Sequence, residues 1–252
     1  MSFLSVAYAL LFYGAAAVLV GGLGFKIWSY FALPVPMKVF TAPAPRTRSG
    51  AALRVAREVM FFESLFHSNK WIWIFGALFH ASLLAVLLAH LRYFIEPVWT
   101  WVVLIQPIGT YAGFGLIAGL GGLWARRLLE ERSRYISGLS DHLMLALLMG
   151  IGLAGLGMKY VGHTDIVAVK AFMMGLIYFD WQPLPTDFFL LAHLGLVAVL
   201  MIILPFSKLL HIPGVFLSPA HNQVDDARER RQLATWNAAL DAVRETPAVH
   251  RE

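Results

Sequence analysis

Four histidines in two long apolar segments are the residues of this chain best suited to redox or proton chemistry. His80 and His90 lie in one segment, and His193 and His211 lie in another and at its end. Ionisable residues inside a membrane are costly and are functional candidates by default. Imidazole is a good iron ligand, and a haem b with two axial histidines takes one from each of two facing helices. Spacing alone leaves three interpretations open, namely two bis-histidine haems, the proton relay of a haem-free proton-coupled transporter, or a structural role.

The directions of the two segments determine how the four histidines would pair. If both segments span a membrane and run in opposite directions, His90 lies level with His193, and His80 lies level with His211. Two haems would then lie one above the other, as electron transfer across a membrane requires. The spacings do not match, because ten residues of helix rise about 15 Å and eighteen rise about 27 Å. Tilt, ligation from opposite sides of each macrocycle, or a bend at Pro205 must absorb the difference.

Composition assigns the chain to the membrane and excludes several cofactors. Its 252 residues are 59% hydrophobic and 14% charged, whereas soluble domains are about 45–50% apolar and about 25% charged. The absence of cysteine excludes iron–sulfur clusters held by this chain, covalent c-type haem and disulfides. The net charge of +5 does not indicate nucleic-acid binding, because the basic residues lie between apolar segments, where they determine topology.

Five apolar segments are long enough to span a membrane, which takes about 20 residues. They are Leu4–Trp28, Trp71–Leu91, Val102–Trp124, Leu139–Met158 and Asp187–Leu210. Basic residues concentrate in residues 32–70, after the third span and in the tail, so the positive-inside rule predicts an outer N-terminus and a cytoplasmic C-terminus. The segment after Met1 lacks a basic n-region and a cleavage site, and is therefore expected to be retained. The sequence thus predicts an all-α integral membrane protein with a five-helix bundle.

The chain is predicted to divide into a membrane domain, residues 1–215, and a cytoplasmic tail, residues 216–252. Three segments outside the spans have recognisable patterns: a cytoplasmic amphipathic helix over 50–68, an outer loop over 161–186, and a tail helix over Val224–Val243. The outer loop contains an apolar stretch, Ile166–Phe179, which is too short to span and is predicted to form an interfacial or re-entrant helix.

Other polar and small residues carry weaker signals. Ser140 and Asp141 lie at the start of the fourth span, where they resemble a helix cap, and His142 follows them. His163 lies in the outer loop, near the expected outer haem. Glycines in the first and third spans are expected to allow close helix packing in lipid. These are Gly21, Gly22 and Gly24 in the first span and Gly113, Gly115, Gly119, Gly121 and Gly122 in the third.

Both histidine segments resemble a known family. Residues 193–218, HLGLVAVLMIILPFSKLLHIPGVFLS, resemble the membrane cytochrome b (gamma) subunit of respiratory nitrate reductase in their two histidines, their spacing and the Pro-Phe-Ser-Lys motif. Residues 78–90, LFHASLLAVLLAH, resemble the other ligand helix of that family. The resemblance implies five helices, an outer N-terminus and two b haems. The outer haem would be held by His90 and His193, and the cytoplasmic haem by His80 and His211.

Shorter motifs resemble a branch of this family that serves sulfur metabolism, the cytochrome b subunit of the complex linked to dissimilatory sulfite reductase. They lie at residues 133–135, 140–143, 214–219 and 222–223. This resemblance implies a multi-pass subunit of the bacterial inner membrane, which transfers electrons between menaquinone or ubiquinone and a cytoplasmic iron–sulfur protein resembling heterodisulfide reductase. Besides membrane lipid, the implied partners are a periplasmic multihaem cytochrome c, a periplasmic iron–sulfur protein and a second membrane subunit. A nitrate reductase gamma subunit is the alternative within the family.

One region departs from the family pattern. The quinone site of the nitrate reductase subunit has a lysine near the start of the third helix, where this chain has Gln106, Thr110 and Tyr111. The quinone contacts therefore cannot be transferred by position, and His90 is the residue expected beside the quinone.

Overall fold

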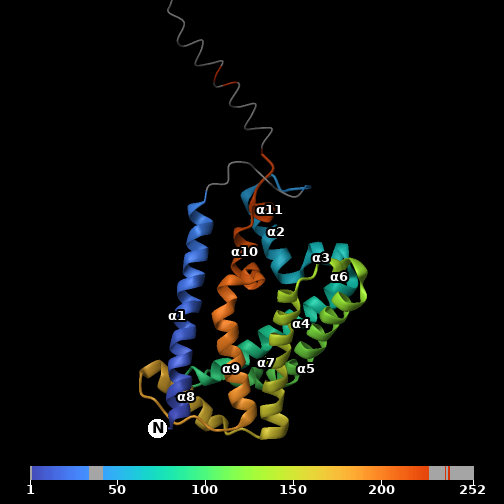
Figure 1. Ribbon diagram of the computed structural model, residues 1–252. Coiled ribbons are helices and arrows are strands. Elements are labelled where there is room, and N and C mark those ends of the chain that lie inside the picture. Colours follow the sequence, from blue (N-terminus) through green and yellow to red (C-terminus); the bar gives the residue numbers. More distant parts are fainter. Residues whose placement is uncertain (1, 34–41, 227–235, 237, 239–252) are drawn as a thin grey trace, which may run out of the picture. The chain divides into compact units, whose positions relative to one another are not determined.

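In the computed structural model, residues 2–33, 42–226, 236 and 238 are described, and the secondary structure within these ranges is entirely helical (Figure 1). Five helices are long and apolar enough to span a membrane: Phe3–Ala32, Lys70–Tyr93, Thr100–Leu129, Leu139–Gly162 and Phe188–Phe206. The predicted number of spans is therefore confirmed. Most of the tail, including nearly all of the helix expected over Val224–Val243, lies outside the described residues.

The spans contain helices α1, α4, α5, α7 and α9, with short helices between and after them. The long helices are α1 (Phe3–Ala32), α4 (Lys70–His90), α5 (Thr100–Leu129), α7 (Leu139–Gly157) and α9 (Phe188–Ile203). The short ones are α2 (Arg48–Phe61), α3 (Glu63–Ser68), α6 (Glu131–Ile136), α8 (Ile166–Tyr178), α10 (His211–Leu217) and α11 (Pro219–Asn222). A π-helical turn, Met158–Gly162, extends α7.

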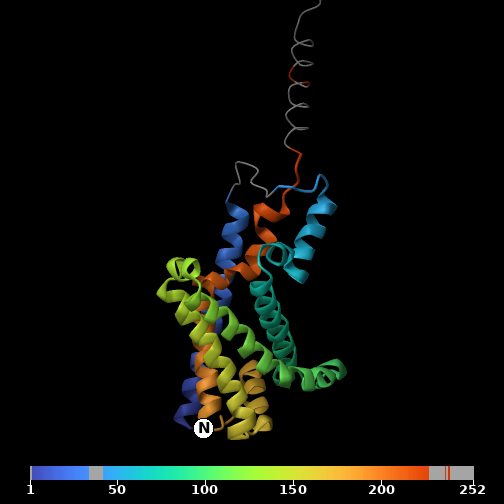
Figure 2. The ribbon, with the colours of Figure 1, turned by 90° about the vertical axis from the view of Figure 1, so that its right-hand side faces the viewer.

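The described residues form two compact units. The first comprises residues 2–26 and 61–210, and the second comprises 27–33, 42–60 and 211–226. His80, His90 and His193 belong to the first unit, whereas His211 is the first residue of the last segment of the second. Within the first unit, successive spanning helices run in alternating directions (Figure 1 and Figure 2).

Glycines on α5 bring it close to α4. A Cβ atom at Gly119 would lie 2.8 Å from the backbone nitrogen of Phe79, and one at Gly109 would overlap Ala89. Residue numbers rise along α5 as they fall along α4, so the two helices are antiparallel. The expectation that glycines of the third span allow close packing is confirmed at Gly113, Gly115, Gly119 and Gly122, whereas Gly121 has no described atom within 4 Å of the position of a Cβ.

The glycines of α1 behave differently. A Cβ atom at Gly22 would lie 2.6 Å from the Cβ of Pro205, so this glycine permits a close approach. Gly21 and Gly24 have no described atom within 4 Å of the position of a Cβ. The packing role predicted for the three glycines of the first span is therefore found at Gly22 and is absent at the other two among the described residues.

Helix α8 confirms the short apolar helix predicted in the outer loop. Its N-cap is Asp165, whose side chain accepts hydrogen bonds from the backbone of Val167 and Ala168. Its fully buried residue Phe172 belongs to an apolar cluster with Phe12 of α1 and residues of α9. The helix is thus attached to two spanning helices, at the end of α1 that holds the N-terminus (Figure 1).

The segment predicted as one amphipathic helix over 50–68 consists of two helices, α2 and α3. Phe62 separates them, with φ of 51° and ψ of 48°. This left-handed conformation costs about 1–2 kcal/mol in residues other than glycine, and it interrupts a regular α-helix. The prediction of a single helix is therefore wrong at this residue.

The fifth span is also shorter than predicted, because α9 ends at Ile203 instead of reaching Leu210. A 3₁₀ turn over Leu204–Phe206 follows, then an extended residue, Ser207, with φ of −105° and ψ of 172°. A second 3₁₀ turn, Lys208–Leu210, leads into α10. Proline has no N–H for the helix ladder, and its ring clashes with the preceding turn. The bend anticipated at Pro205 is therefore present, as a break between two helical segments.

Candidate haem-binding residues

Two of the four predicted ligands face each other within the first unit. The ring centroids of His90 on α4 and His193 on α9 lie 6.2 Å apart, with 20° between the ring planes. An imidazole nitrogen binds a transition metal at about 2.0 Å, so two imidazoles on opposite sides of one ion place their centroids about 6 Å apart. The observed separation meets this requirement. Ordinary aromatic pairs also reach this distance, so the hydrogen bonds of the ring nitrogens are a second observation to consider.

The histidines of α4 direct one ring nitrogen to the backbone. His80 Nδ1 lies 2.8 Å from the carbonyl oxygen of Gly76, and His90 Nδ1 lies 2.7 Å from that of Val86. Each carbonyl lies one turn earlier in the same helix and can only accept a hydrogen bond. The Nδ1 atoms therefore carry the protons and donate, so Nε2 is the nitrogen through which either ring would bind a metal.

His193 is oriented by a neighbouring helix instead of its own. Its Nδ1 lies 2.9 Å from the carbonyl oxygen of Ile151 on α7 and donates to it. One turn further along α7, a Cβ atom at Gly155 would lie 3.4 Å from His193 Cε1. Helix α7 therefore provides both the acceptor and a surface without a side chain for this ring. The sequence offers no signal for either residue, because a backbone carbonyl and a lone glycine have no distinctive pattern.

Two phenylalanine rings lie beside the ring of His80. Its ring centroid lies 4.9 Å from that of Phe79 and 4.9 Å from that of Phe62. The ring planes make angles of 73° and 42°, which are common arrangements of aromatic pairs. The left-handed residue between α2 and α3 therefore contributes to the environment of a predicted ligand.

His211 differs from the other three histidines in its setting. It is exposed and begins α10, directly after the second 3₁₀ turn of the broken fifth span. Because His211 and His80 belong to different compact units, their pairing on one haem stays a prediction.

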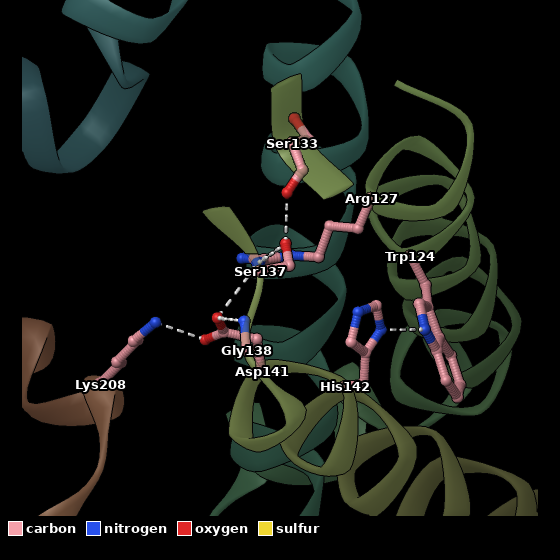
Figure 3. A network of polar contacts seen from close by, with 8 residues as sticks. All are labelled: Trp124, Arg127, Ser133, Ser137, Gly138, Asp141, His142 and Lys208. Carbon is pink, nitrogen blue, oxygen red and sulfur yellow. Dashed lines mark hydrogen bonds and ion pairs between the residues drawn. The ribbon is translucent and has the colours of Figure 1, made fainter. Parts of the chain in front are cut away.

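Asp141 joins three parts of the first unit (Figure 3). Its carboxylate accepts a hydrogen bond of 3.1 Å from the backbone N–H of Gly138, which confirms it as part of a helix cap. The same side chain forms ion pairs with Lys208, at 2.6 Å, and with Arg127 of α5, at 3.7 Å. The cap therefore also links α7 to α5 and to the segment that follows α9.

Two further histidines lie outside the facing pair. His142 Nδ1 accepts a hydrogen bond of 3.1 Å from the indole N–H of Trp124 on α5, so it links two helices (Figure 3). His163 is exposed and ends the π-helical turn in a left-handed conformation, with φ of 44°. Among the described residues, neither ring is paired with that of another histidine.

A lysine lies beside the third spanning helix, although it comes from another part of the chain. Lys159, in the turn that extends α7, donates a hydrogen bond of 2.7 Å to Thr110 Oγ1. One turn earlier, the amide of Gln106 donates to the carbonyl of Ala89, the residue before His90, at 2.9 Å. Sequence comparison by position misses Lys159, because only the packing of α5 against α7 brings it to Thr110.

Comparison with known proteins identifies related membrane subunits. Residues 58–230 match the family described as the nitrate reductase gamma subunit. A relative from Archaeoglobus fulgidus, named Hdr-like menaquinol oxidoreductase cytochrome b-like subunit, is 32% identical over 274 residues, which cover 90% of this chain and 82% of the relative. A relative of the same name from Archaeoglobus profundus is 28% identical over 268 residues, which cover 88% of this chain and 80% of the relative.

Proposed function

Because the chain belongs to the nitrate-reductase-gamma-like family of membrane cytochrome b subunits, we propose that it holds two b haems and transfers electrons from a membrane quinol to a partner protein. His90 and His193 ligate one haem, and His80 and His211 ligate the other. The observation that carries the proposal is the pair of facing imidazoles, 6.2 Å apart, each with its Nδ1 at a backbone carbonyl. When bound, haem iron would supply one-electron transfer between two oxidation states.

The protein contributes ligand orientation and basicity. A histidine whose Nδ1–H donates to a carbonyl is fixed in one tautomer, and its Nε2 becomes a stronger ligand. His193 receives this support from α7, and His90 receives it from its own helix. The apolar side chains along the spans keep water away, which tunes the reduction potential of a bound haem.

Quinol is oxidised, in this proposal, at the haem held by His90 and His193. The name of the relatives favours menaquinol. Quinol oxidation releases protons and needs a hydrogen-bonding group within reach of the ring oxygens. Lys159 and Thr110 are candidates for that contact, since their polar atoms lie on the face between α5 and the end of α7.

The chain would lie in the cytoplasmic membrane, with its N-terminus outside and its C-terminus in the cytoplasm. We infer a bacterial source from the motifs of the sulfur-metabolism branch, although both relatives are archaeal. Electrons would leave by way of the haem of His80 and His211 to an iron–sulfur protein resembling heterodisulfide reductase. Periplasmic multihaem cytochrome c and iron–sulfur subunits and a second membrane subunit would complete the assembly.

Spectroscopy of the purified protein tests the proposal directly. A reduced-minus-oxidised difference spectrum should show a b-type band, and a haem assay should give two haems per chain. A menaquinol analogue should reduce the haem in detergent or vesicles. A protein without haem would contradict the proposal and favour a proton-coupled transporter. Co-purification separates the two members of the family, because a molybdenum enzyme would identify a nitrate reductase subunit and a heterodisulfide-reductase-like protein would identify the sulfur branch.

A further inference from the structure

The break in the fifth span is held in place by packing on one side. Pro205 is fully buried, and Gly22 of α1 approaches it so closely that a Cβ at Gly22 would lie 2.6 Å from the proline Cβ and 2.9 Å from its Cγ. A larger residue at either position would have to push the chain apart. The first turn of the break therefore has a defined position against α1.

Hydrogen bonds within the break also define its shape. Ser207 Oγ donates to the carbonyl of Leu204 at 3.0 Å and accepts from the backbone N–H of Leu209 at 3.2 Å. The serine thus ends one 3₁₀ turn and caps the next, a common use of a hydroxyl at a helix start. These contacts indicate a formed turn and not a frayed helix end.

An ion pair holds the break on its other side. Lys208 Nζ lies 2.6 Å from Asp141 Oδ1 (Figure 3). The Asp141 side chain is only 6% exposed, whereas that of Lys208 is 78% exposed. The carboxylate cannot move easily, because Gly138 and Arg127 also bind it. Lys208 is therefore attached to a fixed point on α7.

We propose that Asp141 and Lys208 are positioning residues for the haem ligand His211, an inference that rests on the proposed function. His211 follows Lys208 by three residues, and a 3₁₀ turn of that length spans about 6 Å. An anchor at Lys208 therefore limits where the backbone of His211 can lie. The ion pair thereby selects one course of the chain after Pro205, which is the point at which the unequal spacings of the two histidine pairs must be reconciled.

A merely stabilising ion pair would behave differently. Pairs with an exposed partner contribute little to stability, with a median of about 0–1 kcal/mol. If Asp141 and Lys208 only fastened α7 to its neighbour, their removal would leave both haems in place or would weaken both together. A positioning role affects the haem of His211 and leaves the haem of His90 and His193 unchanged.

The test removes the charge of the carboxylate and then preserves or removes that of the lysine. In the full chain in detergent, Asp141→Asn and Lys208→Met should each lower the haem content from two per chain towards one. The remaining haem should keep the midpoint potential and spectrum of the wild-type haem that His193→Ala abolishes. Lys208→Arg keeps the charge and should retain two haems. Haem assay and redox potentiometry supply the readouts.

The chain offers a matched control for the loss of an ion pair. Arg126 and Glu130 form a pair of the same length, 2.6 Å, at the end of α5. Glu130→Gln removes this pair without touching the segment after α9, so it should retain two haems at unchanged potentials. Loss of a haem in this variant would mean that any charge change in this region is disruptive, and would overturn the inference.

Three further results would overturn the positioning role. They are two haems at wild-type potentials in Asp141→Asn, loss of both haems together in that variant, and loss of a haem in Lys208→Arg. The proposed function fails separately, if the wild-type protein lacks haem or if His211→Ala keeps both haems. The inference alone would be contradicted if the wild-type protein holds two haems, His211→Ala loses one, and Asp141→Asn keeps both.

Discussion

The two predicted haem sites differ in how their ligands are positioned. His90 and His193 lie on unbroken parts of α4 and α9 within one compact unit, and both rings are oriented by hydrogen bonds to backbone carbonyls. His80 shares this arrangement, but its predicted partner His211 follows a break and belongs to the other unit. One site thus lies between residues of two spanning helices. The other depends on the course of a connecting segment, and should respond to changes far from any ligand.

Removing a ligand gives the largest expected effect and tests whether the two sites are independent. His193→Ala should abolish the haem of the facing pair, because one axial ligand is lost, and should lower the haem content by about half. His80→Ala should abolish the other haem. The haem-to-protein ratio and the midpoint potentials of what remains provide the measurement. Loss of both haems in each variant would show that the sites do not form separately.

Crowding the ring of His193 should affect only the site of His90 and His193. Gly155→Val places methyl groups where a Cβ alone would already lie 3.4 Å from the imidazole. Overpacking of this kind costs about 1–3 kcal/mol, so we expect partial loss of that haem and an altered potential. Gly121→Val, at a position without described neighbours, is the matched control. Unchanged potentials in Gly155→Val would show that α7 does not determine the ring position.

Changing the break should affect only the other site, and less strongly. Pro205→Ala restores an N–H and removes the ring that packs against Gly22. The helix is then free to continue past Ile203, which redirects the chain before His211. We expect a reduced content of one haem and an unchanged potential of the haem bound by His90 and His193. Equal disturbance of both haems would remove the distinction between the sites.

A substitution at the proposed quinol contact gives the smallest expected effect, a change in KM without loss of haem. Thr110→Val removes the hydroxyl that accepts a hydrogen bond from Lys159 and keeps the side-chain volume. We expect the haem content to stay at two and the KM for a menaquinol analogue to rise several-fold. Thr164→Val offers a comparison at another polar contact, since the Thr164 hydroxyl donates to Asp187 instead of accepting from Lys159. A similar KM in both variants would exclude Thr110 from quinol binding.

Much of the architecture could be predicted, because it rests on features that are local in sequence. The five spans follow from runs of apolar residues, and the short helix α8 follows from a run too short to span. The break at Pro205 follows from the chemistry of proline. Single residues were harder, since Phe62 adopts a left-handed conformation that nothing in its neighbourhood indicates.

The contacts that position the candidate ligands could not be predicted from the sequence, for a different physical reason. Ile151 supplies a carbonyl, which every residue has, and Lys159 reaches Thr110 only after two helices have packed. Asp141 could be identified as a cap from its position before the fourth span. Its pairing with Lys208 could not, because 67 residues separate them and charge alone does not select a partner.

The close approach of Gly22 to Pro205 has a consequence for how this protein can be shortened. The family match begins at residue 58, so α1 lies entirely outside it. A fragment starting at residue 58 would keep the four histidines predicted as ligands and would lose Gly22, against which Pro205 packs. Its first turn after α9 would then lack the contact between Pro205 and Gly22. The leading helix therefore helps to position the segment before a predicted ligand that lies nearly two hundred residues away, and a boundary drawn at the family match alone would remove it.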